Sequence, residues 1–214
     1  MNIWVAMCRL VCLVSILLGM TACLNLQKSY PEKRSFALDA SSEGQDPGPE
    51  TTMVLKISKF RVSPLFGGRA MVSRLGEFQY ENDFYDEWFI SPSAMLTQQF
   101  HDWLTKTGRI RFVLLGTNHL EPTHVLEGSV TEFYGDYRVA RAPKAIFGIG
   151  ILLLDELNDR RVLFRRTYHE EVPLTDRTPD ALAGGLSQAV RLVLVDLDRE
   201  LAAMMKTAPV PSSR

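Results

Sequence analysis

Three β-patterned segments in a row, followed by a long helical stripe, occupy most of the second half of this chain. Residues 123–139 have the alternating side-chain pattern of a long strand. Residues 144–157 are a largely apolar run rich in isoleucine and leucine, and residues 161–172 follow across a turn near Asn158-Asp159. The apolar run is too short and too polar at its ends to span a bilayer. It therefore predicts a buried strand, paired with residues 161–172 as a hairpin.

The C-terminal segment predicts a long amphipathic helix. Thr178-Pro179-Asp180 is typical of a capped helix start, because threonine can accept a hydrogen bond from the first turn and proline at the first helical position loses none. The apolar stripe at helical spacing consists of Leu182, Leu186, Val190, Val193, Leu194, Leu197, Leu201 and Met204. Two prolines follow, and residues 207–214 are expected to be a disordered tail.

A second helix is predicted in the middle of the chain. Ser91 is the expected N-cap, Pro92 the first helical residue, and Gly108 closes the run. The apolar stripe of this helix consists of Leu96, Phe100, Trp103 and Leu104.

Shorter extended segments surround this central helix. Strands are expected at residues 35–38, 52–62, 70–75 and 109–115. Leu55 and Ile57 are predicted to share one face of the second of these strands, and Phe60 to lie on the other. Residues 40–51 are rich in Pro, Gly and acidic residues and are expected to be a mobile loop. Residues 52–206 therefore predict a single α/β domain, a mixed β-sheet with the central helix and the long C-terminal helix packed on it.

The N-terminus has the pattern of an export signal. Arg9 precedes an apolar run at Leu10–Leu18, and small residues lie directly before Cys23. Such a stretch is too short for a spanning helix and predicts a secretory signal peptide over residues 1–22. Cys23 in this position resembles the lipobox of bacterial lipoproteins. The resemblance implies cleavage before Cys23, a diacylglycerol on its thiol and a further acyl chain such as palmitate on its amine. An ordinary signal peptide with an incidental thiol is the alternative.

Composition limits what the exported part can bind. The chain has 24 Lys and Arg against 25 Asp and Glu, and loss of residues 1–22 removes only one basic residue. A slightly acidic balance argues against a nucleic-acid binder and against a polybasic surface for anionic lipids. Cys8 and Cys12 would leave with the signal peptide, so Cys23 would be the only cysteine and no intrachain disulfide is expected.

No catalytic or metal-binding constellation is recognisable in the sequence. His101 lies away from the apolar stripe of its helix, and His119 and His124 have a spacing that is not typical of a zinc site. His169 is followed by two glutamates, but neighbouring residues of a strand point to opposite faces, so the three are not expected to converge. The sequence has no Gly-x-Ser-x-Gly elbow and no Walker lysine. We therefore expect no catalytic activity, no metal and no cofactor other than covalent lipid on Cys23.

The segment 78–90 is unusually aromatic, with acidic residues between the rings. Tyrosine and tryptophan suit interfaces where one end of the ring is apolar and the other is hydrated. The residues expected to bind a partner here are Tyr80, Phe84, Tyr85 and Trp88. The alternative is that these rings belong to the core with solvated acids between them, and the periodicity of the segment does not decide between the two.

Four short motifs occur in a consistent order: Arg69–Arg74, Tyr80, Trp88–Pro92 and Gly128–Phe133. Together with the lipobox, they resemble the ABC-type transport auxiliary lipoproteins, the PqiC/YmbA-like group, over most of residues 30–206. The resemblance implies a lipoprotein anchored in the outer membrane and facing the periplasm. Leu24, in place of aspartate, is similar to the sorting signal for that membrane in bacterial lipoproteins.

The family resemblance also implies a role and partners. Its members are auxiliary components of MCE-type ABC transport systems, which move phospholipids or other hydrophobic molecules between the two bacterial membranes. The implied partners are an MCE-domain periplasmic protein and the inner-membrane permease and ATPase, and ring-forming members imply a homo-oligomer. Two alternatives stay open. One is a stand-alone lipid- or lipopolysaccharide-binding lipoprotein with a groove between the sheet and the C-terminal helix. The other is a structural envelope lipoprotein.

Overall fold

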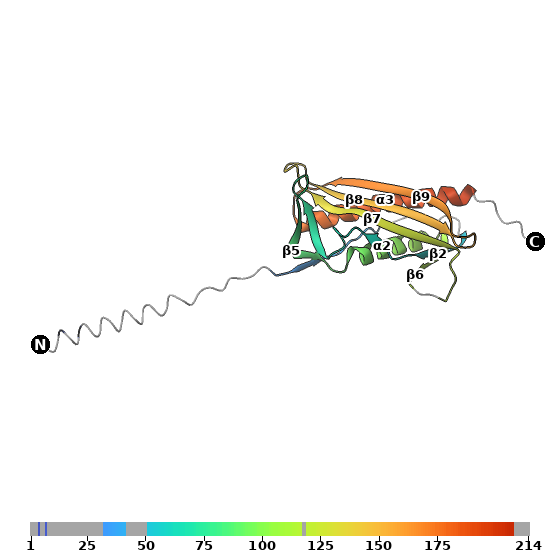
Figure 1. Cartoon of the computed structure of the whole chain (residues 1–214), viewed down its shortest axis with the longest axis horizontal. Helices are drawn as coiled ribbons and strands as arrows, with labels where there is room; N and C mark the ends of the chain where they lie inside the picture. Colours follow the sequence, from blue (N-terminus) through green and yellow to red (C-terminus); the bar gives the residue numbers. More distant parts are fainter. Residues whose placement is uncertain (1–3, 5–6, 8–31, 42–50, 117–118, 208–214) are drawn as a thin grey trace, which may run out of the picture. The chain divides into compact units, whose positions relative to one another are not determined.

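Strand β7 (His124–Asp136) is the strand around which the other eight are arranged in one nine-stranded sheet. The computed structural model describes residues 4, 7, 32–41, 51–116 and 119–207 (Figure 1). The chain divides into two units, Met1–Glu32 and Lys33–Arg214, and the sheet belongs to the second. Cys23, most of the expected signal peptide and tether, residues 42–50 of the expected loop, and residues 208–214 of the expected tail lie outside the described residues.

One edge of β7 is paired along its whole length. Every residue of β8 (Lys144–Asp155) has a partner in antiparallel β7, with one irregularity between Val130 and Glu132. Strand β9 (Arg161–Pro173) pairs antiparallel with the far edge of β8. The turn between β8 and β9 places Asp159 at a φ of 51° and Arg160 at a φ of 56°, the left-handed region that tight turns use. The predicted hairpin is therefore confirmed.

The other edge of β7 is shared by three strands in succession, all parallel to it. They are β2 (Thr51–Ile57), β3 (Arg61–Val62) and β4 (Ala70–Arg74). Their partners on β7 advance along its length, from Leu55 opposite His124, through Arg61 opposite Ser129, to Ser73 opposite Gly135. The chain from residue 51 to residue 74 thus runs alongside β7 and touches it three times.

The single strand predicted at 52–62 was wrong in one respect, because the chain leaves the sheet between β2 and β3. The Phe60 N–H donates to Oγ1 of Thr97, 3.0 Å away in the central helix, instead of to a strand. The Phe60 ring is 2% exposed and meets Phe100 edge to face, with 4.8 Å between ring centroids. Phe60 therefore packs in the same core as Leu55 rather than on the opposite face, and a helix contact takes precedence over strand alternation.

Two small groups of strands extend the sheet from the ends of β7. At one end β6 (Ile110–Leu115) pairs parallel with β2. At the other end β5 (Tyr80–Trp88) pairs antiparallel with β4, and β1 (Arg34–Phe36) pairs parallel with β5. The strands expected near 35–38, 70–75 and 109–115 are confirmed within a residue or two.

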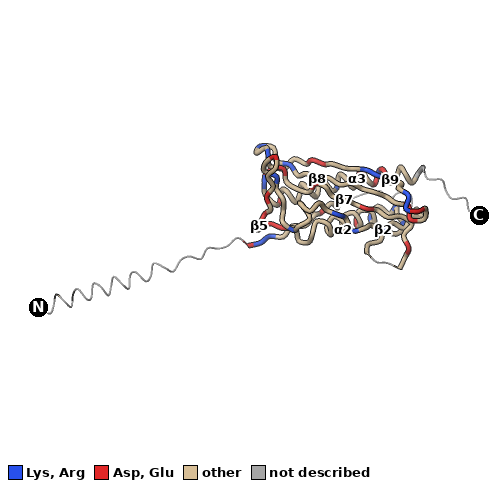
Figure 2. Tube along the Cα trace, viewed as in Figure 1, with Lys and Arg blue, Asp and Glu red and all other residues tan. Residues whose placement is uncertain are grey.

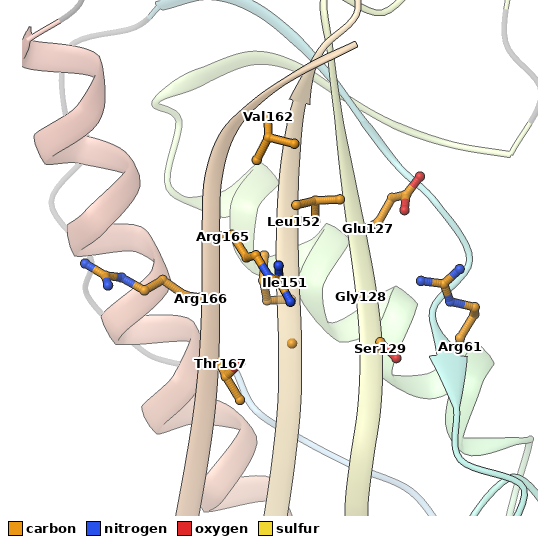
Figure 3. Close-up of a pocket in the computed structure, with 11 residues that line it drawn as sticks. Arg61, Glu127, Gly128, Ser129, Ile151, Leu152, Val162, Arg165, Arg166 and Thr167 are labelled. Atoms are coloured by element: carbon orange, nitrogen blue, oxygen red, sulfur yellow. The ribbon is translucent and has the colours of Figure 1, made fainter.

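Both helices lie on one face of the sheet. The view in Figure 3 has α2 (Pro92–Lys106) and α3 (Pro179–Thr207) behind β7, β8 and β9. The Ser91 Oγ accepts from the Ala94 N–H at 3.4 Å, and Gly108, at a φ of 62°, follows the last turn of α2. Both predicted helices are confirmed, with their stripes in the core. The inward side chains of β8 under α3 are fully buried: Ala145, Phe147, Ile149, Ile151 and Leu153.

Two adjacent glycines of α3 offer a matched test of how closely this helix approaches the sheet. A Cβ on Gly185 would lie 2.9 Å from Cβ of Ala145 and against the side chain of Leu174, whereas one on Gly184 would have nothing within 4 Å. We expect Gly184→Ala to raise the free energy of unfolding by about 0.5–1 kcal/mol, since alanine favours helix. Gly185→Ala should lower it by about 1–3 kcal/mol through overpacking.

Urea unfolding of the two purified variants measures both effects on one helix. Equal stabilisation by the two substitutions would show that α3 can move away from β8 without cost, and would contradict the tight contact.

Candidate functional site

The face of β7, β8 and β9 opposite the helices carries a groove of about 450 Å³ (Figure 3). Its centre is a row of short side chains, since Ser129, Gly150 and Thr167 are register neighbours across the three strands. Gly150 brings backbone to the surface where any other residue would place a side chain. The groove is also lined by Arg61, Glu127, Leu152, Val162 and Arg165.

Of the charged side chains at the rim of the groove, some have an ion-pair partner among the described residues and others do not. Glu127 has an ion pair with Arg160 of the β8–β9 turn, at 3.5 Å. Arg61 and Arg165 form no ion pair with any residue that the structure describes, and Figure 3 shows both side chains directed to the groove side of the sheet. Val162, at the upper rim, is 54% exposed. The groove therefore offers two guanidinium groups beside an apolar contact, a combination suited to binding rather than to bond-making.

One end of this face is closed by an aromatic cluster. The Phe66 ring stacks on Tyr134 with 5.3 Å between centroids, and Tyr80 meets Tyr134 edge to face at 5.7 Å. The guanidinium of Arg74 lies 5.4 Å from the centroid of the Tyr80 ring. The loop before β4 folds over the sheet here, and the groove lies in the other half of β7, β8 and β9, next to the β8–β9 turn.

A histidine between two carboxylates lies on the same open face. Nδ1 of His169 is 2.7 Å from Oε2 of Glu132, and its Nε2 is 3.4 Å from Oε1 of Glu171. Nζ of Lys144 lies 2.7 Å from Glu171. Partial burial lowers the pKa of His169, but the hydrogen bonds to the two carboxylates outweigh it and raise that pKa above its usual value.

The sequence analysis missed half of this cluster. His169 and Glu171 share a face because they are two residues apart in a strand, whereas Glu170 faces the helices, as expected. Glu132 comes from β7, and only the strand register brings it there. Among the residues that the structure describes, no three His, Cys, Asp or Glu side chains form a group that could hold a metal ion. No helix of the described part is long and apolar enough to cross a membrane.

The four residues expected to bind a partner fall in three different places. Trp88 is 2% exposed and packs against Phe133 in the core, with 5.2 Å between ring centroids. Its ring is therefore not accessible to a partner. Tyr80 belongs to the aromatic cluster at the end of the open face. Phe84 and Tyr85 lie together elsewhere on β5, in edge-to-face contact at 5.1 Å.

A local insertion in β5 explains why periodicity failed in this segment. Ala70 of β4 is opposite Glu87, but Val72 is opposite Asn82, so β5 has extra residues between the two pairs. Oδ1 of Asp83 accepts from the Tyr85 and Asp86 N–H groups, each at 2.8 Å, and thereby replaces strand hydrogen bonds. Phe84, at the crest of this bulge, is 74% exposed.

Two of the four acidic residues of β5, Asp86 and Glu87, form ion pairs with neighbouring segments of the chain. Arg34 of β1 forms two hydrogen bonds with Asp86, of 2.7 and 3.0 Å, and Asp86 is only 6% exposed. On the other side, Arg69 lies 2.6 Å from Glu87. Arg34 lies on β1 and Arg69 directly precedes β4, so these ion pairs help to hold β1, β5 and β4 together; Figure 2 shows basic and acidic residues close together at this end of the domain.

The sequence matches no family model, and no curated protein is similar to it. Solved structures are similar in fold. A DUF330-family protein from Xanthomonas campestris superposes with a TM-score of 0.71 at 19% identity, over 81% of this chain and 97% of that one. An uncharacterised protein superposes with a TM-score of 0.62 at 18% identity, over 79% of this chain and 99% of that one. At these identities the comparisons show that the α/β fold is shared.

The His169 cluster predicts a measurable titration. The imidazole should titrate above the ordinary histidine pKa of about 6.5, and Glu132→Gln should bring its pKa down by removing the shorter carboxylate contact. A raised pKa means that the imidazolium stabilises the fold below the unfolded pKa, and that this contribution is lost as pH rises through the folded pKa.

NMR titration of the His169 ring protons measures this shift. Glu127→Gln, on the same strand but outside the cluster, is the matched control and should leave the pKa of His169 in place. An unchanged pKa in Glu132→Gln would contradict the assigned contact.

Proposed function

We propose that this protein is a non-catalytic auxiliary lipoprotein of an MCE-type ABC transport system. Acylated Cys23 anchors it in the outer membrane, facing the periplasm, and the groove on its open sheet face receives the MCE-domain partner. The system would move phospholipids or other hydrophobic molecules between the membranes. Support comes from the lipobox-like sequence, the motifs between Arg69 and Phe133, and a fold shared with a DUF330-family protein.

The observation that carries this proposal is the one-sided covering of the sheet. The helices bury one face of β7, β8 and β9, and the other face retains a groove with an exposed valine and two arginines without ion pairs among the described residues. Buried or paired charges would add little to binding, whereas exposed guanidinium groups can form bidentate contacts with carboxylates of a partner. The groove is also shallow and spread over three strands, as a protein-docking surface is.

The stand-alone lipid-binding alternative is less well supported. This alternative requires a groove between the sheet and the C-terminal helix, but the inner face of α3 is packed against β8 and β9. Val190, Val193, Leu194 and Leu197 are all 0% exposed. An acyl chain bound there would have to displace well-packed side chains, and burial of such side chains is worth about 1.5–3 kcal/mol each.

A free sheet edge supports the homo-oligomer that the family resemblance implies. Among the described strands, β9 pairs only with β8, so its other edge presents backbone groups along a 13-residue strand. Charged side chains on β9, including Arg165 and Glu171, oppose indiscriminate pairing at such an edge. A second copy of the chain would add a strand at this edge.

Anchoring is tested by Cys23→Ser. The wild-type chain should incorporate labelled palmitate at Cys23. Because several acyl chains together give stable anchoring, it should also sediment with outer membranes. The variant should do neither, because it has no thiol to acylate. Labelling of Cys23→Ser equal to that of the wild type would contradict lipidation at this residue.

Docking is tested by photo-crosslinking in intact cells of the native host. We expect p-benzoylphenylalanine at Thr167, in the groove, to crosslink to an MCE-domain protein identified by mass spectrometry. The same probe at Gln188, on the exposed face of α3, is the matched control and should not. Crosslinking of an MCE protein from Gln188 alone would place the docking surface on the helices and contradict the proposed groove.

A further inference from the structure

Large apolar side chains are exposed where the chain enters the folded domain. Phe84 is 74% exposed, Phe89 is 66% exposed and Ile90 is 42% exposed, and we call these three residues with Lys33 the anchor-side patch. They lie on or directly after β5, beside the edge strand β1. The Phe89 N–H donates to the Phe36 carbonyl at 2.7 Å, so the end of β1 and the patch are bonded to one another.

The patch has the local form of a surface that enters an apolar phase. Phe84 stands on the crest of the β5 bulge, where Asp83 holds the backbone outward. Beside Phe89 and Ile90 is a shallow hollow of about 160 Å³, whose other lining residues are Ala37, Leu38, Met95, Gln98 and Gln99. Exposed aromatic and aliphatic side chains held by ordered backbone, next to an apolar hollow, mark an interaction site rather than ordinary surface.

The charges around the patch indicate that it contacts lipid through its apolar side chains rather than through electrostatic attraction to headgroups. Asp86 and Glu87 are paired with Arg34 and Arg69, so the patch has no strong net charge. Nζ of Lys33 lies 5.5 Å from the centroid of the Phe84 ring. A lysine whose ammonium lies beside an exposed aromatic ring can keep its charge among headgroups while the ring enters the acyl region.

The length of the preceding chain selects the occupant. Lys33 comes only ten positions after Cys23, and a chain of that length spans at most about 36 Å when fully extended. If Cys23 is acylated, the patch is therefore held close to the bilayer surface, and a weak contact with lipid is strengthened by the high local concentration.

We propose that the anchor-side patch inserts into the phospholipid interface to which Cys23 is tethered. This contact orients the domain, because the patch lies at the β4 and β5 end of the sheet, while the groove lies toward the β8–β9 turn. The inference rests on the lipid anchoring proposed above. A bilayer, rather than a second copy of the chain or a protein partner, covers Phe84, Phe89 and Ile90.

The test uses environment-sensitive labels, which the cysteine content of the chain permits. Cys23 is the only cysteine after residue 22 and its thiol is blocked when acylated. Single cysteines are introduced as Phe84→Cys and Phe89→Cys, and as Phe112→Cys and Leu157→Cys for controls. The controls are 46% and 72% exposed and lie on β6 and in the β8–β9 turn, near the other end of β7.

Each acylated, full mature chain is labelled with a nitrobenzoxadiazole dye and reconstituted into phosphatidylethanolamine–phosphatidylglycerol vesicles. We expect a blue shift and at least twofold quenching by lipid-attached spin labels at positions 84 and 89, and neither at 112 and 157. Labels at 84 and 89 that stay hydrated would overturn the proposal. A blue shift without lipid quenching would also overturn it, because protein and not lipid would then cover the patch.

A second arm separates this inference from the proposed anchoring. Each chain is also made with Cys23→Ser and a histidine tag in place of residues 1–22, and is bound to vesicles that contain a nickel-chelating lipid. Insertion at positions 84 and 89 is expected in this arm as well. Failure of the native chain to float with vesicles, with insertion retained in the nickel arm, would overturn the lipid anchor and leave the patch assignment standing.

Discussion

The unequal use of the two edges of β7 is the constraint on which the rest of the structure depends. One edge is paired with β8 without interruption, and the other is divided among β2, β3 and β4. The continuous edge produces a long, regular three-strand surface with β9. The divided edge requires the chain to leave the sheet between contacts, and those departures bring Phe60 and Phe66 to opposite faces of it.

Covering only one face of that sheet produces a molecule with two different sides. The inner side is closed by side chains of α2 and α3, and Gly185 allows α3 to approach β8 closely. The outer side is left with short residues at its centre and an aromatic cluster at one end. A groove in this position needs no specialised loop, because Gly150 and the register of its neighbours are enough to form it.

Arginines at the β5 end of the sheet form ion pairs that join strands, whereas two arginines at the groove form none with the residues that the structure describes. Arg34 and Arg69 are used to join β1, β4 and β5 through Asp86 and Glu87. Arg61 and Arg165, by contrast, have no ion-pair partner among the described residues. The same residue type therefore holds strands together in one place and remains accessible for binding in another, and composition alone does not distinguish the two.

The sequence by itself determined both helices, the β8–β9 hairpin and the α/β class, because caps and apolar periodicity are local properties. Only the tertiary structure decided the functional surfaces. Trp88 and Phe84 belong to one aromatic segment, yet a bulge capped by Asp83 leaves the first in the core and the second exposed. His169 meets Glu132 through strand register, across 37 residues of sequence. Such positions depend on which strands pair, and a pairing is a property of the assembled sheet.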